Sequence, residues 1–501
     1  MLYPVLFFIF IIIFLYLNFV VSKICFNTYK QYREKNDSLC FKDYLVSKKI
    51  EVFKNYFAIP ALLCTCVILL SISLLGLYEL ALIFNIVLFS SFFIISILKF
   101  SILKEPLVLT DFYLFKEICI SPRFYFAYIN KKIWFVICIA MLLSCVLLSI
   151  INYSPIPNNI RLIGLFIFCI SLLSLFYFVK KSYIEFDALV DGFKCSVITS
   201  FLIQIKELFK TKALIKKEGI ESFIENAKLK QSHNLKDDIT SHIVLIQAES
   251  YCSLHRMGVD KTQSFIDYND TIIKQGLLDI DYLGAYTMRT EFSVLTGLDR
   301  KKLNIFAFDP YILCRKYKIN SLASKLSNKG YECICIHPNN KKFFQRDIVL
   351  KNLGFTKFLS KDDLLYLKGD KGYISDADLI VKVKEILKQS SNKKIFIFVI
   401  TMECHGPYKD KNLKGQDSDL TVYRQKILHF NLALESFVKD TQKDTSLIVY
   451  GDHLPSIKSI FKSKAKLKPD VFSVNTVAFS QNIIATQDIH NLVLKKGGVD
   501  A

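Results

Sequence analysis

The stretch Y-G-D-H-L-P, from Tyr450 to Pro455, follows the short apolar run S-L-I-V-Y and places Asp452 and His453 directly after it. A second acidic motif, Q-A-E-S from Gln247 to Ser250, ends the run H-I-V-L-I-Q in the same way. Apolar runs of this length, bounded by polar residues, are typical of buried strands in a parallel sheet. The pattern predicts that Glu249, Asp452 and His453 lie just past the carboxyl ends of strands, where open α/β sheets bind ligands.

These three side chains are of the kinds that bind a divalent cation, since two carboxylates and one imidazole suit Zn or Mn. The stretch Y-T-M-R-T-E-F adds Thr287, whose hydroxyl would complete the ligand set and be activated as a nucleophile. Each motif alone has a simpler interpretation: Thr287 or Glu249 could cap a helix, and Asp452–His453 could form a turn. Their occurrence together at strand ends favours a metal site.

A second group of polar residues follows two further strand-like runs. The stretch I-H-P-N-N-K-K-F-F-Q-R-D places His337 past one run and Arg346 nine residues later, and T-M-E-C-H-G-P-Y places His405 past I-F-I-F-V-I. Histidine and arginine at one sheet edge could bind a phosphate, for which arginine offers bidentate hydrogen bonds. The alternatives are a salt bridge for Arg346 and a packed, structural His337.

The first part of the chain is too apolar for an ordinary soluble enzyme. The 501 residues are 52% hydrophobic with a mean hydropathy of +0.32, and the excess lies in about the first 180 residues. Segments near the 20 or so residues that span a bilayer are expected at Leu2–Val21, Phe57–Leu77, Leu80–Leu98, Ile133–Ile151 and Leu162–Val179. The first has no basic n-region and no A-x-A-like site, so we expect a retained anchor.

From residue 241 onward, strand-like and helix-like stretches alternate, which predicts an α/β domain with a largely parallel sheet. Strands are expected at 243–248, 278–283, 332–337, 394–401 and 446–450, and helices near 288–296, 318–329, 375–389 and 420–438. We expect a transmembrane domain over 1–181, a connector over 182–240 and a catalytic domain over 241–501. The connector stretch from Ser200 predicts an amphipathic helix, lying on lipid headgroups or packed on the soluble domain.

The net charge of +20 raises the question of a nucleic-acid partner. No basic patch interleaves with aromatic residues in a known arrangement, so we expect no nucleic acid and attribute the charge to lysine-rich membrane flanks that attract anionic lipid. The 14 cysteines include no C-x-x-C pair with a zinc-site partner. We therefore expect no disulfide framework.

Taken together, the motifs from about His242 to Ser456 resemble the sulfatase-fold phospholipid headgroup transferases of the alkaline phosphatase superfamily. Lipoteichoic acid synthases, phosphoglycerol transferases and phosphoethanolamine transferases belong to this group. The resemblance implies one divalent metal ion, Mn or Zn, held by Glu249, Thr287, Asp452 and His453. It also implies substrate binding by His337, Phe344, Arg346 and His405. Two positions depart from the family pattern: a tryptophan is replaced by Phe344, and an acidic residue by Asn339.

The activity implied by the resemblance is transfer of a phosphoglycerol or phosphoethanolamine group from a phospholipid donor to a cell-surface glycan acceptor, through a phosphorylated Thr287. No C/S-x-P-x-R motif lies near Thr287, so sulfate ester hydrolysis is not expected. Two alternatives stay open. One is a phosphodiesterase or phosphatase of the same fold, and the other is a non-catalytic relative that binds lipid or glycan in envelope polysaccharide assembly.

The expected location is a bacterial cytoplasmic membrane, crossed several times, with the catalytic domain on its periplasmic or extracellular side. The resemblance implies that side. The charge rule points the other way, because the loops after the first and third apolar segments are rich in Lys and Arg and would share a side with the catalytic domain. We follow the resemblance, since lysine is abundant throughout this chain and dilutes the rule.

Overall fold

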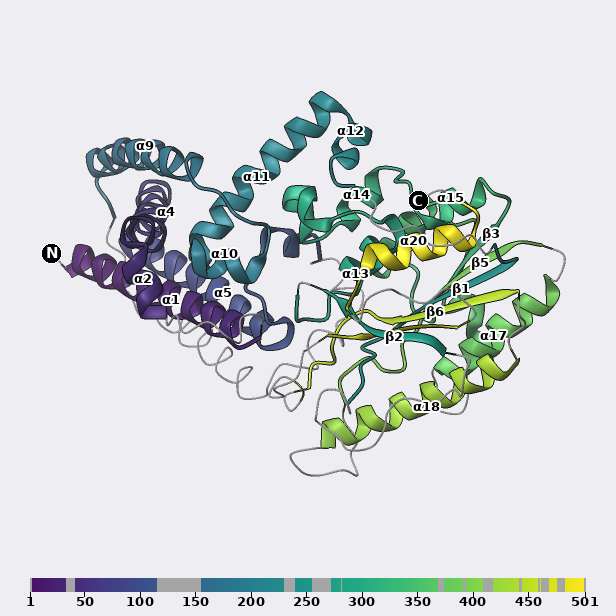
Figure 1. The fold of residues 1–501 in the computed structure, drawn as a ribbon. Helices are drawn as coiled ribbons and strands as arrows, with labels where there is room; N and C mark the ends of the chain where they lie inside the picture. Colours follow the sequence, from purple (N-terminus) through teal and green to yellow (C-terminus); the bar gives the residue numbers. More distant parts are fainter. Residues whose placement is uncertain are drawn as a thin grey trace. The chain divides into compact units, whose positions relative to one another are not determined.

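A computed structural model of the chain describes residues 2–32, 41–114, 155–228, 239–254, 272–280, 282–367, 374–390, 393–408, 418–440, 444–457, 460, 468–474 and 483–499. The chain forms two compact units (Figure 1). The first comprises residues 1–113 and 123–217, and the second comprises residues 114–122 and 218–501.

The first unit is helical and apolar. Four of its helical stretches are long and apolar enough to cross a membrane: Tyr3–Gln31, Lys49–Leu75, Tyr78–Leu103 and Asn158–Lys180. They cover four of the five predicted segments, and the fifth, Ile133–Ile151, lies outside the described residues. The second segment was predicted to run to Leu77, but helix α4 (Ile59–Leu75) stops at Gly76, whose φ of +69° is a left-handed C-cap that glycine adopts without steric cost.

The predicted connector forms helix α11 (Val197–Glu218), preceded by the short helix α10 (Ala188–Lys194). Only together are the two helices long and apolar enough to cross a membrane, and the chain bends by 119° between them. Helix α11 buries one face, which includes Ile203, Glu207 and Thr211, and exposes Phe209 and Lys210. The predicted separation of apolar and basic faces is therefore incomplete.

The second unit is built on an eight-stranded sheet of order β4-β3-β5-β1-β6-β7-β2-β8. The strands are β1 (His242–Ala248), β2 (Ile272–Asp279), β3 (Glu332–Ile336), β4 (Lys357–Leu359), β5 (Ile395–Ile400), β6 (Thr445–Gly451), β7 (Asp470–Val474) and β8 (Ile483–Ala485). The pairs made by β7 with β6 and β2 are antiparallel and the others are parallel, which confirms the predicted sheet. Strands β1, β5 and β6 are buried along their whole length, because apolar residues fill both faces.

Helices cover both faces of this sheet: α13 (Thr287–Thr296), α15 (Leu322–Ser327) and α20 (Thr486–Lys496) lie on one side, and α17 (Asp376–Gln389) and α18 (Ser418–Asp440) on the other (Figure 1). The remaining helices of this unit include α12 (Ile220–Glu225), α14 (Tyr311–Lys316) and α16 (Arg346–Asn352). Two predictions need correction. The strand predicted at 278–283 ends at Asp279 and begins six residues earlier, and the helix predicted near 318–329 spans only Leu322–Ser327, because Ser321 caps its first turn.

The ten cysteines within the described ranges are all free, and nine of them are buried. Cys333 and Cys335 lie on β3 with almost no exposed surface, as expected for packed residues on one strand. The prediction of a fold without a disulfide framework therefore holds for the described part of the chain.

Candidate metal and phosphate site

The acidic residues Glu249 and Asp452 follow the neighbouring strands β1 and β6 at one edge of the sheet. Their parallel register pairs Ala248 with Gly451, so Glu249 and Asp452 leave the sheet side by side at its carboxyl edge. Gly451 is needed there, because a Cβ at this position would lie 2.1 Å from the carbonyl oxygen of Tyr251. The two predicted motifs thus meet at the strand ends.

Glu249, Asp452 and His453 form a buried cluster whose ligand atoms all lie within 4.8 Å of one another. Nε2 of His453 is 3.4 Å from Oε1 of Glu249 and 3.2 Å from Oδ2 of Asp452. The hydroxyl Oγ1 of Thr287 lies 3.3 Å from the same Nε2. The structure therefore brings together all four residues of the predicted ligand set.

Hydrogen bonds fix the orientation of these side chains. The backbone N–H groups of Ser250 and His453 donate to Oδ1 of Asp452, at 2.8 and 3.0 Å, while Oδ2 of Asp452 has no hydrogen-bond partner within the described residues. Nδ1 of His453 donates to the carbonyl oxygen of Leu454 at 3.0 Å, which directs Nε2 toward the carboxylates. An unsatisfied carboxylate oxygen beside an oriented imidazole fits a divalent cation.

The charges of the cluster shift its proton affinities. Burial, together with the negative charge of Glu249, raises the pKa of Asp452 to about 7. Burial alone would lower the pKa of His453, but Asp452 and Glu249 outweigh it and raise that pKa above its ordinary value. Near neutral pH the cluster thus retains protons that a cation would replace.

Thr287 is the first residue of helix α13, and Tyr286 occupies the N-cap. The alternative in which Thr287 is itself the N-cap is therefore wrong. A hydroxyl at this position lies at the positive dipole end of a helix, which favours a phosphoryl group. The helix is tied to the acidic cluster, because Oγ1 of Thr290 donates to the carbonyl oxygen of Asp452 at 2.7 Å.

His337 and Arg346 form a second buried cluster. Nδ1 of His337 donates to the carbonyl oxygen of Ile400 at 3.0 Å, and its Nε2 lies 3.2 Å from Nη1 of Arg346. Burial, with the Arg346 charge, lowers the pKa of His337 well below its usual range, so the imidazole is neutral. Arg346 also forms a buried ion pair of 2.8 Å with Glu291, which confirms the salt-bridge alternative.

The other two predicted substrate-binding residues are Phe344, which lies two residues before Arg346, and His405, which follows strand β5. Phe344 has a φ of +55°, and its ring centroid lies 5.3 Å from Cζ of Arg346. His405 is partly exposed, with Nδ1 2.6 Å from the carbonyl oxygen of Gly406. Its segment is attached to the acidic cluster, since Oγ1 of Thr401 accepts a hydrogen bond from the N–H of Glu249 at 3.0 Å.

Two buried acidic residues near the site escaped the sequence analysis. Glu291 is the acidic residue of the T-M-R-T-E-F motif, and Asp376 begins helix α17. Oδ1 of Asp376 accepts from the N–H groups of Met402 and Glu403, both at 3.1 Å, and so holds the segment that leads to His405. Burial raises the pKa of Asp376 to about 7. The sequence feature that could have pointed to Glu291 is its spacing of four residues from Thr287, which places both residues on one face of a helix.

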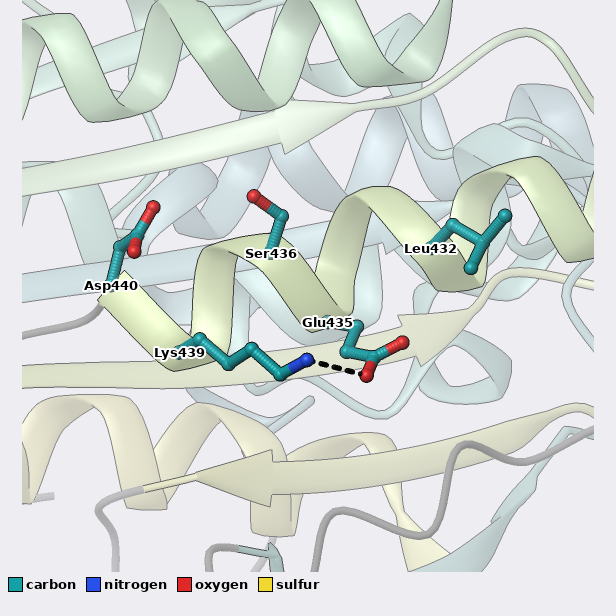
Figure 2. A pocket seen from close by; sticks show the side chains of 5 residues that line it. All are labelled: Leu432, Glu435, Ser436, Lys439 and Asp440. Carbon is teal, nitrogen blue, oxygen red and sulfur yellow. Dashed lines mark hydrogen bonds and ion pairs between the residues drawn. The ribbon is translucent and has the colours of Figure 1, made fainter.

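A shallow hollow elsewhere on the second unit is lined by α18 alone, through Leu432, Glu435, Ser436, Lys439 and Asp440 (Figure 2). Lys439 and Glu435 form an exposed ion pair of 2.8 Å across it. None of the predicted site residues lines this hollow.

The fold and the buried acidic cluster define an α/β protein with a candidate metal site at the carboxyl edge of a mostly parallel sheet. The chain belongs to the sulfatase family, whose model matches residues 241–494. This membership confirms the fold that the motifs predicted.

The chain is also similar to curated relatives and to solved structures. The chain is 25% identical over 415 residues to the capsular polysaccharide biosynthesis protein RkpI of Rhizobium meliloti (strain 1021), covering 77% of this chain and 76% of that protein. It is 33% identical over 152 residues to the lipoteichoic acid synthase of Staphylococcus aureus (strain USA300), covering 26% and 23%. Among solved structures, the lipoteichoic acid synthase LtaP from Listeria monocytogenes is 17% identical with a TM-score of 0.44, covering 56% of this chain and 78% of that one. The Streptococcus pyogenes phosphoglycerol transferase GacH, solved with sn-glycerol-1-phosphate, is 20% identical with a TM-score of 0.42, covering 59% and 81%.

Proposed function

We propose that this protein is a membrane-anchored, metal-dependent transferase that moves a phosphoglycerol or phosphoethanolamine group from a phospholipid to a cell-surface glycan. The observation that carries the proposal is the position of Thr287, whose Oγ1 lies at a helix N-terminus 3.3 Å from Nε2 of His453 and beside two buried carboxylates. The likeness to a polysaccharide biosynthesis protein and a lipoteichoic acid synthase supports a role in envelope glycan synthesis.

The reaction would proceed in two displacements. In the first, Oγ1 of Thr287 attacks the phosphorus of the phospholipid, the bond from phosphorus to the diacylglycerol oxygen breaks, and diacylglycerol leaves with the proton. In the second, an acceptor hydroxyl attacks the phosphorus of the phosphothreonine, the bond from phosphorus to Oγ1 of Thr287 breaks, and Oγ1 takes up the proton that the acceptor loses. A divalent cation held by Glu249, Asp452 and His453 would make the Thr287 hydroxyl easier to deprotonate and offset charge on the phosphoryl oxygens.

The chain's own groups would position the phosphate. The positive dipole end of α13 would favour the developing negative charge, and Arg346 and His337 would supply a cation and a neutral imidazole. The membrane spans suit a lipid donor, because its phosphate lies at the headgroup layer.

The test is intact-mass analysis and peptide mapping of the full-length protein in detergent, incubated with Mn²⁺ and phosphatidylglycerol or phosphatidylethanolamine. We expect a phosphoglycerol or phosphoethanolamine adduct on Thr287, diacylglycerol release, and loss of both in Thr287→Ala. The matched control is Thr296→Ala, because the Thr296 hydroxyl bonds only to nearby backbone: it donates to the carbonyl oxygen of Phe292 at 2.7 Å and accepts from the N–H of Leu298 at 3.3 Å. Headgroup release to water without an acceptor would favour the hydrolase. An unmodified Thr287 without diacylglycerol release would favour a non-catalytic binder.

For location we propose a bacterial cytoplasmic membrane with the second unit on its outer side, against the distribution of basic residues in the loops. Alkaline phosphatase and green fluorescent protein fusions after Ala501 test the side. We expect phosphatase activity from the alkaline phosphatase fusion and no fluorescence from the green fluorescent protein fusion. Fluorescence without phosphatase activity would place the unit in the cytoplasm.

A further inference from the structure

Three residues of the site, Glu249, Thr287 and Asp452, each have a buried polar residue close to them in sequence. Gln247 on β1 precedes Glu249 by two residues, Tyr450 on β6 precedes Asp452 by two, and Glu291 follows Thr287 by four on α13. Glu249 and Asp452 lie just past the ends of their strands, whereas Thr287 and Glu291 share one face of their helix. The three elements that supply the site thus each carry a second polar residue close to the one that they contribute.

These side chains are joined to one another. The register of β1 and β6 pairs Gln247 with Tyr450, whose hydroxyl donates to Oε1 of Gln247 at 2.6 Å. Nε2 of Gln247 donates to Oε2 of Glu291 at 3.3 Å, and the hydroxyl of Tyr311 donates to Oε1 of Glu291. Gln247, Tyr450, Glu291 and Tyr311 all have 0% exposed surface, so the network is shielded from water.

The same carboxylate continues the network toward the second cluster. Nη2 of Arg346 donates to Oε2 of Glu291 at 2.8 Å, and Nη1 of Arg346 lies 3.2 Å from Nε2 of His337, which can only accept there because Nδ1 donates to Ile400. The guanidinium is thus held at two of its nitrogens. Its third nitrogen, Nε, is buried and has no hydrogen-bond partner within the described residues.

We infer that Glu291 is a positioning residue that fixes the guanidinium of Arg346 against His337 and links this pair to the helix of Thr287. The role follows from charge and geometry. Arg346 is 2% exposed, and Glu291 is the carboxylate that neutralises it; the planar guanidinium can meet Glu291 and His337 together only in one orientation. This inference deepens the proposed function and rests on it for the identity of the ligand, which is an anionic phosphate headgroup.

The test is a double-mutant cycle with Glu291→Gln and Arg346→Ala in the full-length protein in detergent, with Mn²⁺ present. Two quantities are measured: kcat/KM for diacylglycerol release from phosphatidylglycerol, and the affinity for sn-glycerol-1-phosphate by calorimetry. Because Glu291 acts through Arg346, we expect Glu291→Gln to lower both about 10- to 100-fold, the range typical of groups that orient a ligand-binding residue. In the Arg346→Ala background the same change should have no further effect.

Three results would overturn the inference. One is that Glu291→Gln lowers kcat/KM and the affinity by the same factor whether or not Arg346 is present. Another is unchanged kcat/KM and affinity in Glu291→Gln. The third is a loss of Mn²⁺ affinity of similar size, which would indicate general disturbance of the site. Glu435→Gln is the matched control, because its carboxylate is in the surface ion pair of Figure 2. If Glu291→Gln does not fold, Tyr311→Phe removes a donor to the same carboxylate and should show the same dependence on Arg346.

The two readouts separate this inference from the proposed function. If the wild-type protein releases no diacylglycerol but Glu291→Gln weakens glycerol phosphate binding only when Arg346 is present, the transferase proposal fails and the positioning role stands. If diacylglycerol is released and the two substitutions act independently, the transferase proposal stands and the positioning role fails.

Discussion

Metal binding to Glu249, Asp452 and His453 should release protons, and the structure gives the expected number. A cation binds ionised carboxylates and a neutral imidazole, so any proton on these groups below neutral pH must leave. The pKa of Asp452 is raised to about 7 and that of His453 is raised above its ordinary value, so both groups hold protons at pH 6. One to two protons should therefore leave for each ion bound.

The sign and size of the effect follow from this count. Raising the pH removes the competing protons, so the apparent affinity for Mn²⁺ should increase with pH and level off above the pKa values of the free site. One proton gives a tenfold change for each pH unit and two give a hundredfold change, so we expect an increase of about 10- to 100-fold between pH 5.5 and 6.5.

The assay is calorimetric titration of the full-length protein with Mn²⁺ in two buffers of different ionisation enthalpy, which counts the protons directly. Asp309→Asn is the matched control, since it removes another buried carboxyl group whose pKa is raised by burial but which lies outside the cluster. Its proton count should equal that of the wild type, whereas Asp452→Asn should lose about one proton. A metal affinity that is constant from pH 5.5 to 7, or a proton count that falls with Asp309→Asn, would refute this assignment of ligands.

Three further predictions concern the nucleophile, a buried acid and a close contact. Thr287→Ala should lower headgroup release by about 1,000-fold or more, as expected for loss of a nucleophile, in a diacylglycerol assay in which Thr296→Ala stays near wild type. Because burial raises the pKa of Asp376 to about 7 in the folded protein, its ionisation destabilises the fold. The free energy of unfolding should therefore fall by on the order of 4 kcal/mol as the pH rises from about 4 to about 7. In Asp376→Asn, the protection of peptides spanning 395–408 against hydrogen exchange should depend less on pH than in the wild type. Gly451→Ala should cost about 3 kcal/mol in urea unfolding, because its Cβ would meet the Tyr251 carbonyl oxygen at 2.1 Å, whereas Gly330→Ala, with no atom within 4 Å, should cost only the roughly 1–2 kcal/mol of its positive φ.

The central strands could be predicted because each is a continuous apolar run that is buried on both faces. Strands β1, β5 and β6 match their predicted ranges within a residue or two. Strands β4 and β8 have three residues each, too few to give a periodic signal, and β7 is a five-residue strand flanked by polar residues. Strand β2 was misplaced because its first half, I-I-K-Q-G, contains lysine and glycine, while the following L-L-D-I-D-Y-L alternates like a strand.

The position of the site could be predicted for a related reason, since the acidic motifs end buried strands and parallel strands end at one edge. The partners of each residue could not. Glu291 is paired with Arg346, which lies 55 residues later, and Asp376 holds backbone groups 26 and 27 residues away. Such contacts depend on how the helices dock on the sheet, which no local pattern in the sequence encodes.

The cysteines make this protein suited to site-specific labelling. All five described cysteines of the second unit (Cys252, Cys314, Cys333, Cys335 and Cys404) are buried, and burial raises the pKa of each of these thiols, so maleimides should not modify them in the native state. A single cysteine introduced at an exposed position such as Lys357 should therefore be the main reactive thiol among the described residues of that unit. A membrane-impermeant reagent applied to intact cells would then read out the sidedness of the unit without any fusion partner.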